Sequence, residues 1–170
     1  ENKRVALDTL DNYTYLGHTR FKDPGTYEIE VYANASVGDT IVFRSVGLAL
    51  ARTLGRWSGA SSDGRFHVDG EAGAVSVDQS IMLVDSTMFK KGFVGSYKLG
   101  DEVQEFNDPV KVSLMSYQED QAIYQRNHDN TWIELPSYYD QGRIVAYTEK
   151  MGYFRLGRKT LVVPGLTSLG

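Results

Sequence analysis

The alternation that decides the fold is clearest at residues 26–33, which read Thr-Tyr-Glu-Ile-Glu-Val-Tyr-Ala. Apolar side chains occupy every second position from Tyr27 to Ala33, and Glu28 and Glu30 stand between them. Because successive side chains of a β-strand point to opposite faces, this period of two predicts a strand with one face buried and the other in water.

Similar runs, rich in Tyr, Val, Thr and Phe, recur along the chain and are separated by turn signals such as Lys22-Asp23-Pro24-Gly25. Residues 46–54 are rich in Leu and Ala and could form a helix, but they continue a β-rich run and are predicted to be extended. Strands at intervals of about 8 to 12 residues predict an all-β protein, an antiparallel immunoglobulin-like sandwich. The further predicted strands are 4–7, 13–20, 40–49, 65–68, 80–85, 95–99, 110–114, 121–125, 131–134, 143–148 and 153–156.

Composition excludes several classes of protein. The chain has 170 residues, of which 41% are hydrophobic, so it can bury a core. The absence of Cys excludes disulfides, thiolate zinc sites and cysteine nucleophiles. A net charge of -4 argues against nucleic-acid binding, and no apolar run is long enough for membrane insertion. A start at Glu1, without an apolar leader, is expected of a mature product or an excised segment.

The predicted organisation has two parts. The Gly-rich segment 55–73 is expected to be a linker or a crossing between sheets. The boundary near Trp57 gives an immunoglobulin- or fibronectin-like segment at 1–57, a β-sandwich at 58–158 and a tail at 159–170.

An ordered set of motifs follows Arg65. It comprises Ala72-Gly73-Ala74-Val75, Phe106-Asn107-Asp108-Pro109-Val110, Trp132 and Phe154-Arg155-Leu156-Gly157. In this order the set resembles the ankyrin/zona-occludens type β-sandwich modules of bacterial secreted and surface proteins. One departure is Glu71, where that family usually has Pro.

Self-cleavage, which some members of that family carry out at His-Phe-Ser, is not implied here, because this chain reads Phe66-His67-Val68. Residues 23–33 and 37–40 are similar to the closing hairpin of bacterial immunoglobulin-like or fibronectin-type modules. Together these resemblances imply a non-catalytic accessory domain that is extracellular or on the cell surface.

Catalytic motifs are absent from the sequence: it has no GxSxG, HExxH, GxGxxG or GxxxxGK[ST]. Ser61, Ser62, Asp63 and His67 include the residue types of a nucleophilic triad. They crowd into one Gly-rich loop, whereas triad members usually come from separate elements. A hydrolase centred on Ser62 and His67 is therefore a weak alternative, and we expect no enzyme and no cofactor.

Metal binding has equally little support in the sequence. The three histidines lack ligand spacing. Carboxylate and amide oxygens of Asp8, Asp11 and Asn12, or of Asp129 and Asn130, could bind calcium, but turn chemistry explains them better. No metal site is predicted.

Aromatic residues are the one excess in composition: 11 Tyr, 7 Phe and 2 Trp. Tyr and Trp combine an apolar ring with a polar tip, and so suit both interfaces and sugar stacking. The candidate ligand-binding residues are Tyr13, Tyr15, Trp57, Tyr138 and Tyr139.

We therefore expect a structural or interaction module, in the C-terminal accessory region of a larger secreted or cell-surface bacterial protein such as a peptidase. Its partners would be other domains of the parent chain or a surface protein. The alternative is a carbohydrate-binding module that holds a polysaccharide with exposed Tyr and Trp. The predicted core consists of Tyr27, Ile29, Val31, Phe66, Ile81, Leu83, Phe106, Val110, Val112, Leu114, Trp132, Ile144, Ala146 and Phe154.

Overall fold

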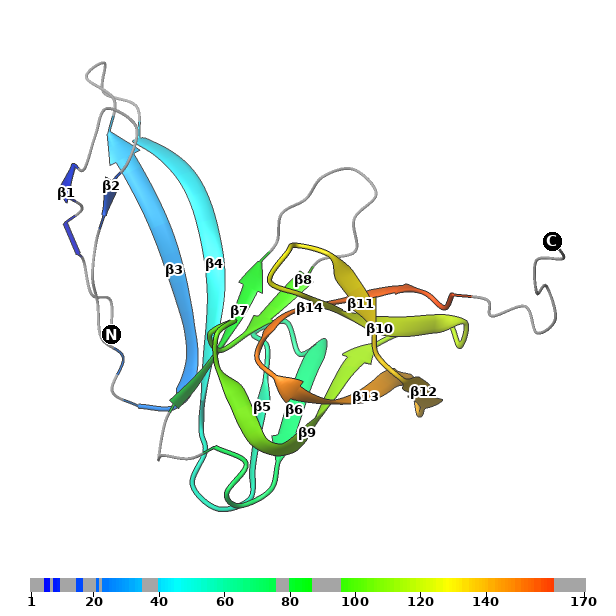
Figure 1. Cartoon of the computed structure of the whole chain (residues 1–170). Helices are drawn as coiled ribbons and strands as arrows, with labels where there is room; N and C mark the ends of the chain where they lie inside the picture. The colour runs from blue at the N-terminus through cyan, green and yellow to red at the C-terminus, as the bar shows by residue number, and fades with distance from the viewer. Residues whose placement is uncertain are drawn as a thin grey trace, which may run out of the picture.

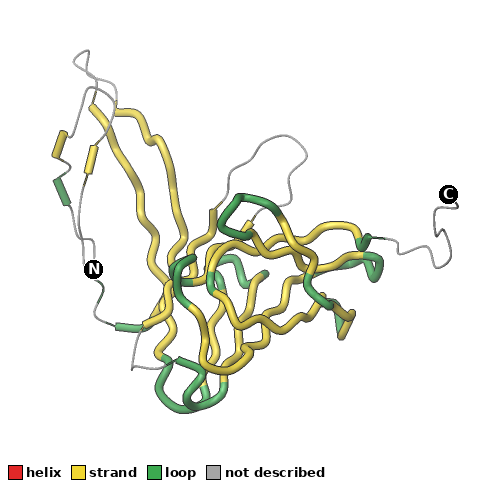
Figure 2. Tube along the Cα trace, in the orientation of Figure 1, coloured by secondary structure: helices red, strands yellow, loops and turns green. Residues whose placement is uncertain are grey.

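The fold is an antiparallel β-sandwich. The computed structural model describes residues 5–6, 8–9, 15–16, 21, 23–34, 40–75, 80–86 and 96–160. Those residues contain strands and no helix (Figure 2). The predicted all-β class is confirmed, because two antiparallel sheets pack together around one core.

The larger sheet has seven strands. Their spatial order is β11 (Trp132–Glu134), β10 (Gln121–Arg126), β14 (Gly152–Arg158), β8 (Ser96–Leu99), β7 (Ser80–Ser86), β4 (Thr40–Arg52) and β3 (Gly25–Asn34). The smaller sheet has five, in the order β12 (Ser137–Asp140), β13 (Arg143–Lys150), β9 (Glu105–Met115), β6 (Phe66–Gly70) and β5 (Trp57–Ala60). A separate pair consists of β1 (Asp8–Thr9) and β2 (Tyr15–Leu16).

The core lies between the two sheets, and the period of two explains how it forms. In β6, Phe66 and Val68 are buried while Asp69 is exposed. The ring of Phe66 stacks on Tyr97 and Phe154 of the opposite sheet, with centroids 5.4 and 5.6 Å apart. Such ring pairs contribute about 0.5 to 1.5 kcal/mol beyond the area they bury.

Most of the predicted core is confirmed, since ten of its members are buried: Phe66, Ile81, Leu83, Phe106, Val110, Val112, Leu114, Ile144, Ala146 and Phe154.

Three aromatic and aliphatic predictions turned out differently. Trp132 is not in the core: it is half-buried, and the Arg155 guanidinium lies 4.2 Å from its ring centroid. Tyr27 and Ile29 are also only half-buried, because β3 is the edge strand of its sheet. The side chain of Val31 lies outside the described residues.

Strands from both predicted segments share one sheet. β3 and β4, from segment 1–57, lie beside β7, from segment 58–158. β4 confirms the extended interpretation of residues 46–52. Of the two predictions for the Gly-rich segment 55–73, the crossing between sheets is confirmed, because the chain passes there from β4 in the larger sheet to β5 in the smaller one. The segment then forms the β5–β6 hairpin. Only residues 159 and 160 of the predicted tail are described.

The β3–β4 hairpin extends past the rest of its sheet as a two-stranded ribbon (Figure 1). Only Leu48–Arg52 of β4 pair with β7, so residues 40–47 have β3 as their partner. Pairing at the base therefore fixes this ribbon to the sandwich.

A hydrogen-bonded carboxylate ties the two sheets together. Asp63, in the β5–β6 turn, accepts bonds from Ser61 Oγ at 2.6 Å, Arg65 N at 3.0 Å and the Tyr97 hydroxyl of β8 at 2.8 Å. Burial raises the pKa of Asp63, but these bonds and the charge of Arg65 outweigh that effect, so the pKa lies below its ordinary value. Asp63 therefore stabilises the fold in its ionised form.

Replacing this carboxylate should produce a pH-dependent loss of stability. We expect Asp63→Ala to lower the free energy of unfolding by about 1 to 2 kcal/mol at neutral pH, a modest figure because Asp63 is exposed to solvent. A lowered folded-state pKa gives stability that is present above about pH 4 and is lost as pH falls through the folded pKa. In urea titrations, the difference from the parent should therefore shrink in acid; a difference that is constant with pH would contradict this role.

Candidate functional site

Exposed hydrophobic side chains gather at one side of the sandwich, where β11 and β12 are the edge strands. Six of the nine large hydrophobic residues exposed in the described part of the chain belong to β9, the turn after it, β11, β12 or β13. Since scattered exposed residues need no explanation but grouped ones mark contact surfaces, we treat this group as the candidate site. We call it the tyrosine edge; its members are Met115, Tyr117, Ile133, Tyr138, Tyr139 and Tyr147.

Strand pairing brings Tyr138 and Tyr147 together. Tyr138 pairs with Val145 across β12 and β13, and Tyr147 follows Val145 on the same face two residues later. Both rings are about half exposed, at 48% and 54%, while Val145 is buried. Desolvation, then a hydrogen bond that its hydroxyl donates to Tyr147, raise the pKa of Tyr138. The two rings thus form a joint surface.

Tyr139 and Tyr117 expose further aromatic area near this pair, with Tyr139 on the opposite face of β12 from Tyr138. Tyr139 pairs with the core residue Ile144, yet is 37% exposed because β12 is an edge strand. Tyr117, in the turn after β9, is almost fully exposed, and its hydroxyl lies 3.8 Å from the sulfur of Met115. The tyrosine edge therefore presents aromatic area along β12 and at the end of β9.

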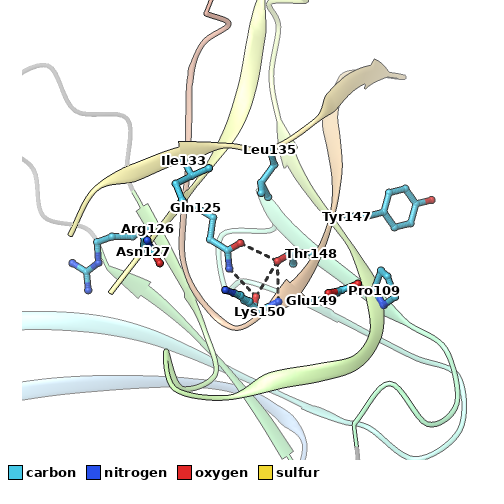
Figure 3. A pocket seen from close by; sticks show the side chains of 10 residues that line it. All are labelled: Pro109, Gln125, Arg126, Asn127, Ile133, Leu135, Tyr147, Thr148, Glu149 and Lys150. Carbon is cyan, nitrogen blue, oxygen red and sulfur yellow. Dashed lines mark hydrogen bonds between the residues drawn. The ribbon is translucent and has the colours of Figure 1, made fainter. Parts of the chain in front are cut away.

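A groove of about 380 Å³ adjoins the tyrosine edge. It exists because β12 pairs only with Arg143–Ala146, so the remaining part of β13 has no partner on that side among the described residues. Figure 3 shows Ile133 and Leu135 along one side of the groove. The lining residues are Pro109, Gln125, Arg126, Asn127, Ile133, Leu135, Tyr147, Thr148, Glu149 and Lys150.

Two buried polar side chains of the groove, Gln125 and Thr148, bond to each other and to the backbone of Lys150 (Figure 3). The Thr148 hydroxyl donates to Gln125 Oε1 at 2.9 Å, and Gln125 Nε2 donates to the carbonyl oxygen of Lys150 at 2.8 Å. The amide of Lys150 in turn donates to Thr148 Oγ1 at 3.1 Å. This network joins β10 to β13 across the two sheets. A ligand in the groove would therefore contact mainly the apolar walls and the rim.

The five candidate residues from the sequence end in different places. Tyr138 and Tyr139 lie exposed on β12. Trp57 is 5% exposed and packs in the core beside Phe106, so it presents no surface to a ligand. Tyr13 lies outside the described residues, and of Tyr15 only its place in β2 is described.

Tyr147 and Ile133 belong to the site but were not predicted. The signal for Tyr147 was present, because it follows the predicted core residue Ala146 in a predicted strand and so falls on the outward face. Its contact with Tyr138 depends on the pairing of β12 with β13, which local sequence does not reveal.

The serine, aspartate and histidine of the Gly-rich loop have other contacts. Ser61 is buried and donates to Asp63, whose oxygens also accept bonds from Arg65 and Tyr97. His67 points outward from β6, and burial, followed by the charge of Arg143, lowers its pKa. Ser61 and Asp63 thus shape the β5–β6 turn.

Asp129 shows the turn chemistry that the sequence favoured. Oδ1 of Asp129 accepts hydrogen bonds from the backbone amide of Thr131 at 2.9 Å and from the Thr131 hydroxyl at 2.5 Å. These bonds lower the pKa of Asp129. In the described residues, no group of three acidic or histidine side chains is placed to bind a metal. Nor do those residues contain an apolar helix of membrane-spanning length.

Fold and surface together define an antiparallel β-sandwich with one aromatic edge. No protein-family model and no curated protein matches the sequence.

Proposed function

We propose that this chain is a non-catalytic interaction module, and that the tyrosine edge binds a protein partner: another domain of its parent chain or a surface protein. The observation that supports this proposal is the grouping of six exposed hydrophobic side chains along β9, β11, β12 and β13. Tyr and Met are enriched at protein interfaces, whereas isolated hydrophobic residues are common anywhere on a surface.

The composition of the edge suits protein binding physically. A tyrosine ring buries a large apolar area, loses few rotamers, and keeps a hydroxyl for hydrogen bonding. The pairing of β12 with β13 holds Tyr138 and Tyr147 beside each other before a partner arrives. Such preorganisation lowers the entropy cost of binding.

The setting we propose is the C-terminal accessory region of a larger secreted or cell-surface bacterial protein, such as a peptidase. The resemblance of residues 65–157 to ankyrin/zona-occludens type modules supports it, as does the similarity of residues 23–40 to immunoglobulin-like hairpins. In this setting the parent protein would carry the catalysis, and this module would act outside the cytoplasm.

A carbohydrate ligand is the second candidate, because Tyr147, one of the two paired tyrosines, is among the residues that line a groove. Its volume, about 380 Å³, falls in the range of small-ligand sites. Asn127 and Glu149 on the lining could bond sugar hydroxyls while a tyrosine ring stacks on the sugar.

NMR titration of the isotope-labelled chain distinguishes a protein partner from a carbohydrate ligand. One arm adds the flanking domains of the full gene product, and the other adds soluble polysaccharides. We expect the flanking domains to shift the amides of Ile133, Tyr138 and Tyr147. Tyr138→Ala with Tyr147→Ala should weaken this binding at least about 30-fold, as loss of interface anchors does.

Val103→Ala is the matched control, because Val103 is 74% exposed, lies outside the tyrosine edge, and should bind like the parent. Shifts at the edge with polysaccharide alone would favour the carbohydrate alternative. If neither ligand shifts the edge, or if the double variant binds like the parent, the proposal is wrong.

A further inference from the structure

The free edge of β5 lies beside a second cavity, on the opposite side of the five-stranded sheet from the tyrosine edge. This cavity, which we call the β5 slot, has a volume of about 310 Å³ and runs between Pro24–Thr26 and Ser58–Ser61. Ala49, Ala51 and Leu83, all buried, also line it. The slot thus joins an open strand edge to the small residues of the core.

The backbone of β5 offers hydrogen-bonding groups toward this slot. The amide of Ser61 donates to the carbonyl oxygen of Phe66 at 2.8 Å, in register with the β5–β6 pairs. Bonding and non-bonding pairs alternate along an antiparallel ladder, so the backbone groups of Ser58 and Ala60 point away from β6. Among the described residues no strand pairs with β5 on that side.

β5 also lacks the charged residues that the sequences of the other edge strands of the two sheets contain. The edge strand β3 contains Glu28 and Glu30, β11 contains Glu134, and β12 contains Asp140. β5 reads Trp-Ser-Gly-Ala and contains neither charge nor proline. Because edge strands normally carry such residues to prevent pairing, β5 is the edge that is open to an added strand.

The sheet above the slot argues against a second copy of the chain as the occupant. A Cβ on Gly59 would lie 2.9 Å from Ala51 Cβ and 3.1 Å from Leu83 Cδ1, so β4 and β7 lie directly across from β5. β3, beside β4, therefore reaches over the position next to β5. A symmetric copy paired through β5 would need that space for its own β4. A single extended strand does not.

We propose that the β5 slot binds an extended segment of a partner polypeptide, which adds to the sheet as a strand beside β5. Its inward side chains must be small, because Gly59, Ala49 and Ala51 leave little depth. Its charge is neutral or acidic, since the lining contains Arg52 and no acidic residue. Main-chain bonds to Ser58 and Ala60 supply the affinity, as in other strand additions.

Amide exchange on the whole chain tests this site, with a short blocked peptide that alternates alanine and threonine and carries one aspartate as the probe. At saturating peptide, we expect exchange of the Ser58 and Ala60 amides to slow about tenfold or more. The same peptide with phenylalanine in place of alanine should have no effect, because its side chains do not fit the slot.

Two variants of the chain complete the design. Ala60→Pro removes an outward N–H without removing a bond to β6, and Thr26→Trp fills the slot from β3 and leaves β5 intact. Both should abolish the protection of the Ser58 amide, which remains measurable in each variant, while their melting stays cooperative. The proposal is overturned if the alanine peptide protects neither amide, if protection survives Thr26→Trp, or if sedimentation shows a dimer that Ala60→Pro dissociates.

Discussion

Gly70→Ala is expected to lower the free energy of unfolding by about 3 kcal/mol, the upper range for overpacking of a core. A Cβ on Gly70 would lie 2.2 Å from both Cε2 and Cζ2 of Trp57. The indole cannot move away easily, because it is 5% exposed and packs beside Phe106. Denaturant unfolding of the variant and the parent measures the effect.

A second substitution identifies the cause of that loss. Trp57→Leu removes the ring that the new methyl group would strike, so the double variant with Gly70→Ala should lose at least about 1 kcal/mol less than the sum of the two single losses. Ser58→Ala, on the outward face of β5, is the control and should unfold like the parent. A Gly70→Ala variant as stable as the parent would mean that Trp57 does not lie against β6.

Phe154→Ala should cost about 3 to 5 kcal/mol, because the ring is fully buried and its removal leaves a cavity. Phe154 stacks on Phe66 and lies on β14, which pairs with β8 and β10 in the middle of the seven-stranded sheet. The Phe154 ring therefore joins the two sheets, and its strand, β14, joins β8 to β10 within one sheet. Calorimetric melting measures the loss.

The matched control is the adjacent Tyr153→Ala. The ring of Tyr153 is half-buried and has the Arg126 guanidinium 3.8 Å from its centroid. Its loss should cost about 1 kcal/mol, the size of one exposed cation–π contact with some packing. Equal losses at the two positions would contradict the alternation of β14 between core and surface.

Period-two alternation was enough to predict most strands and ten core positions, because burial of one face of a strand leaves a local pattern. The alternation could not predict which of the two tryptophans is the more buried. Trp57 is buried because β6 places Gly70 opposite it, and Trp132 is half-buried because β11 is an edge strand. Both facts depend on pairing between distant segments, which neighbouring residues do not show.

The candidate site was predicted in part for the same reason. Tyr138 and Tyr139 stand out as adjacent aromatics beside Asp140, and the structure places both at the surface. Their grouping with Tyr147 and Ile133 follows from the short length of β12 and from the sheet edges that meet there. Strand length and edge position are properties of the whole sheet, so no local sequence motif predicts the groove.

Oxidative footprinting of tyrosine side chains tests the central claim most directly, by comparing the isolated chain with the full, longer gene product that the proposal predicts. We predict that Tyr138 and Tyr147 are oxidised readily in the isolated chain and are protected in the full product, while Tyr153, on the other sheet, reacts equally in both. Equal oxidation of Tyr138 and Tyr147 in the two samples would contradict the proposal that the tyrosine edge is the contact surface of this module.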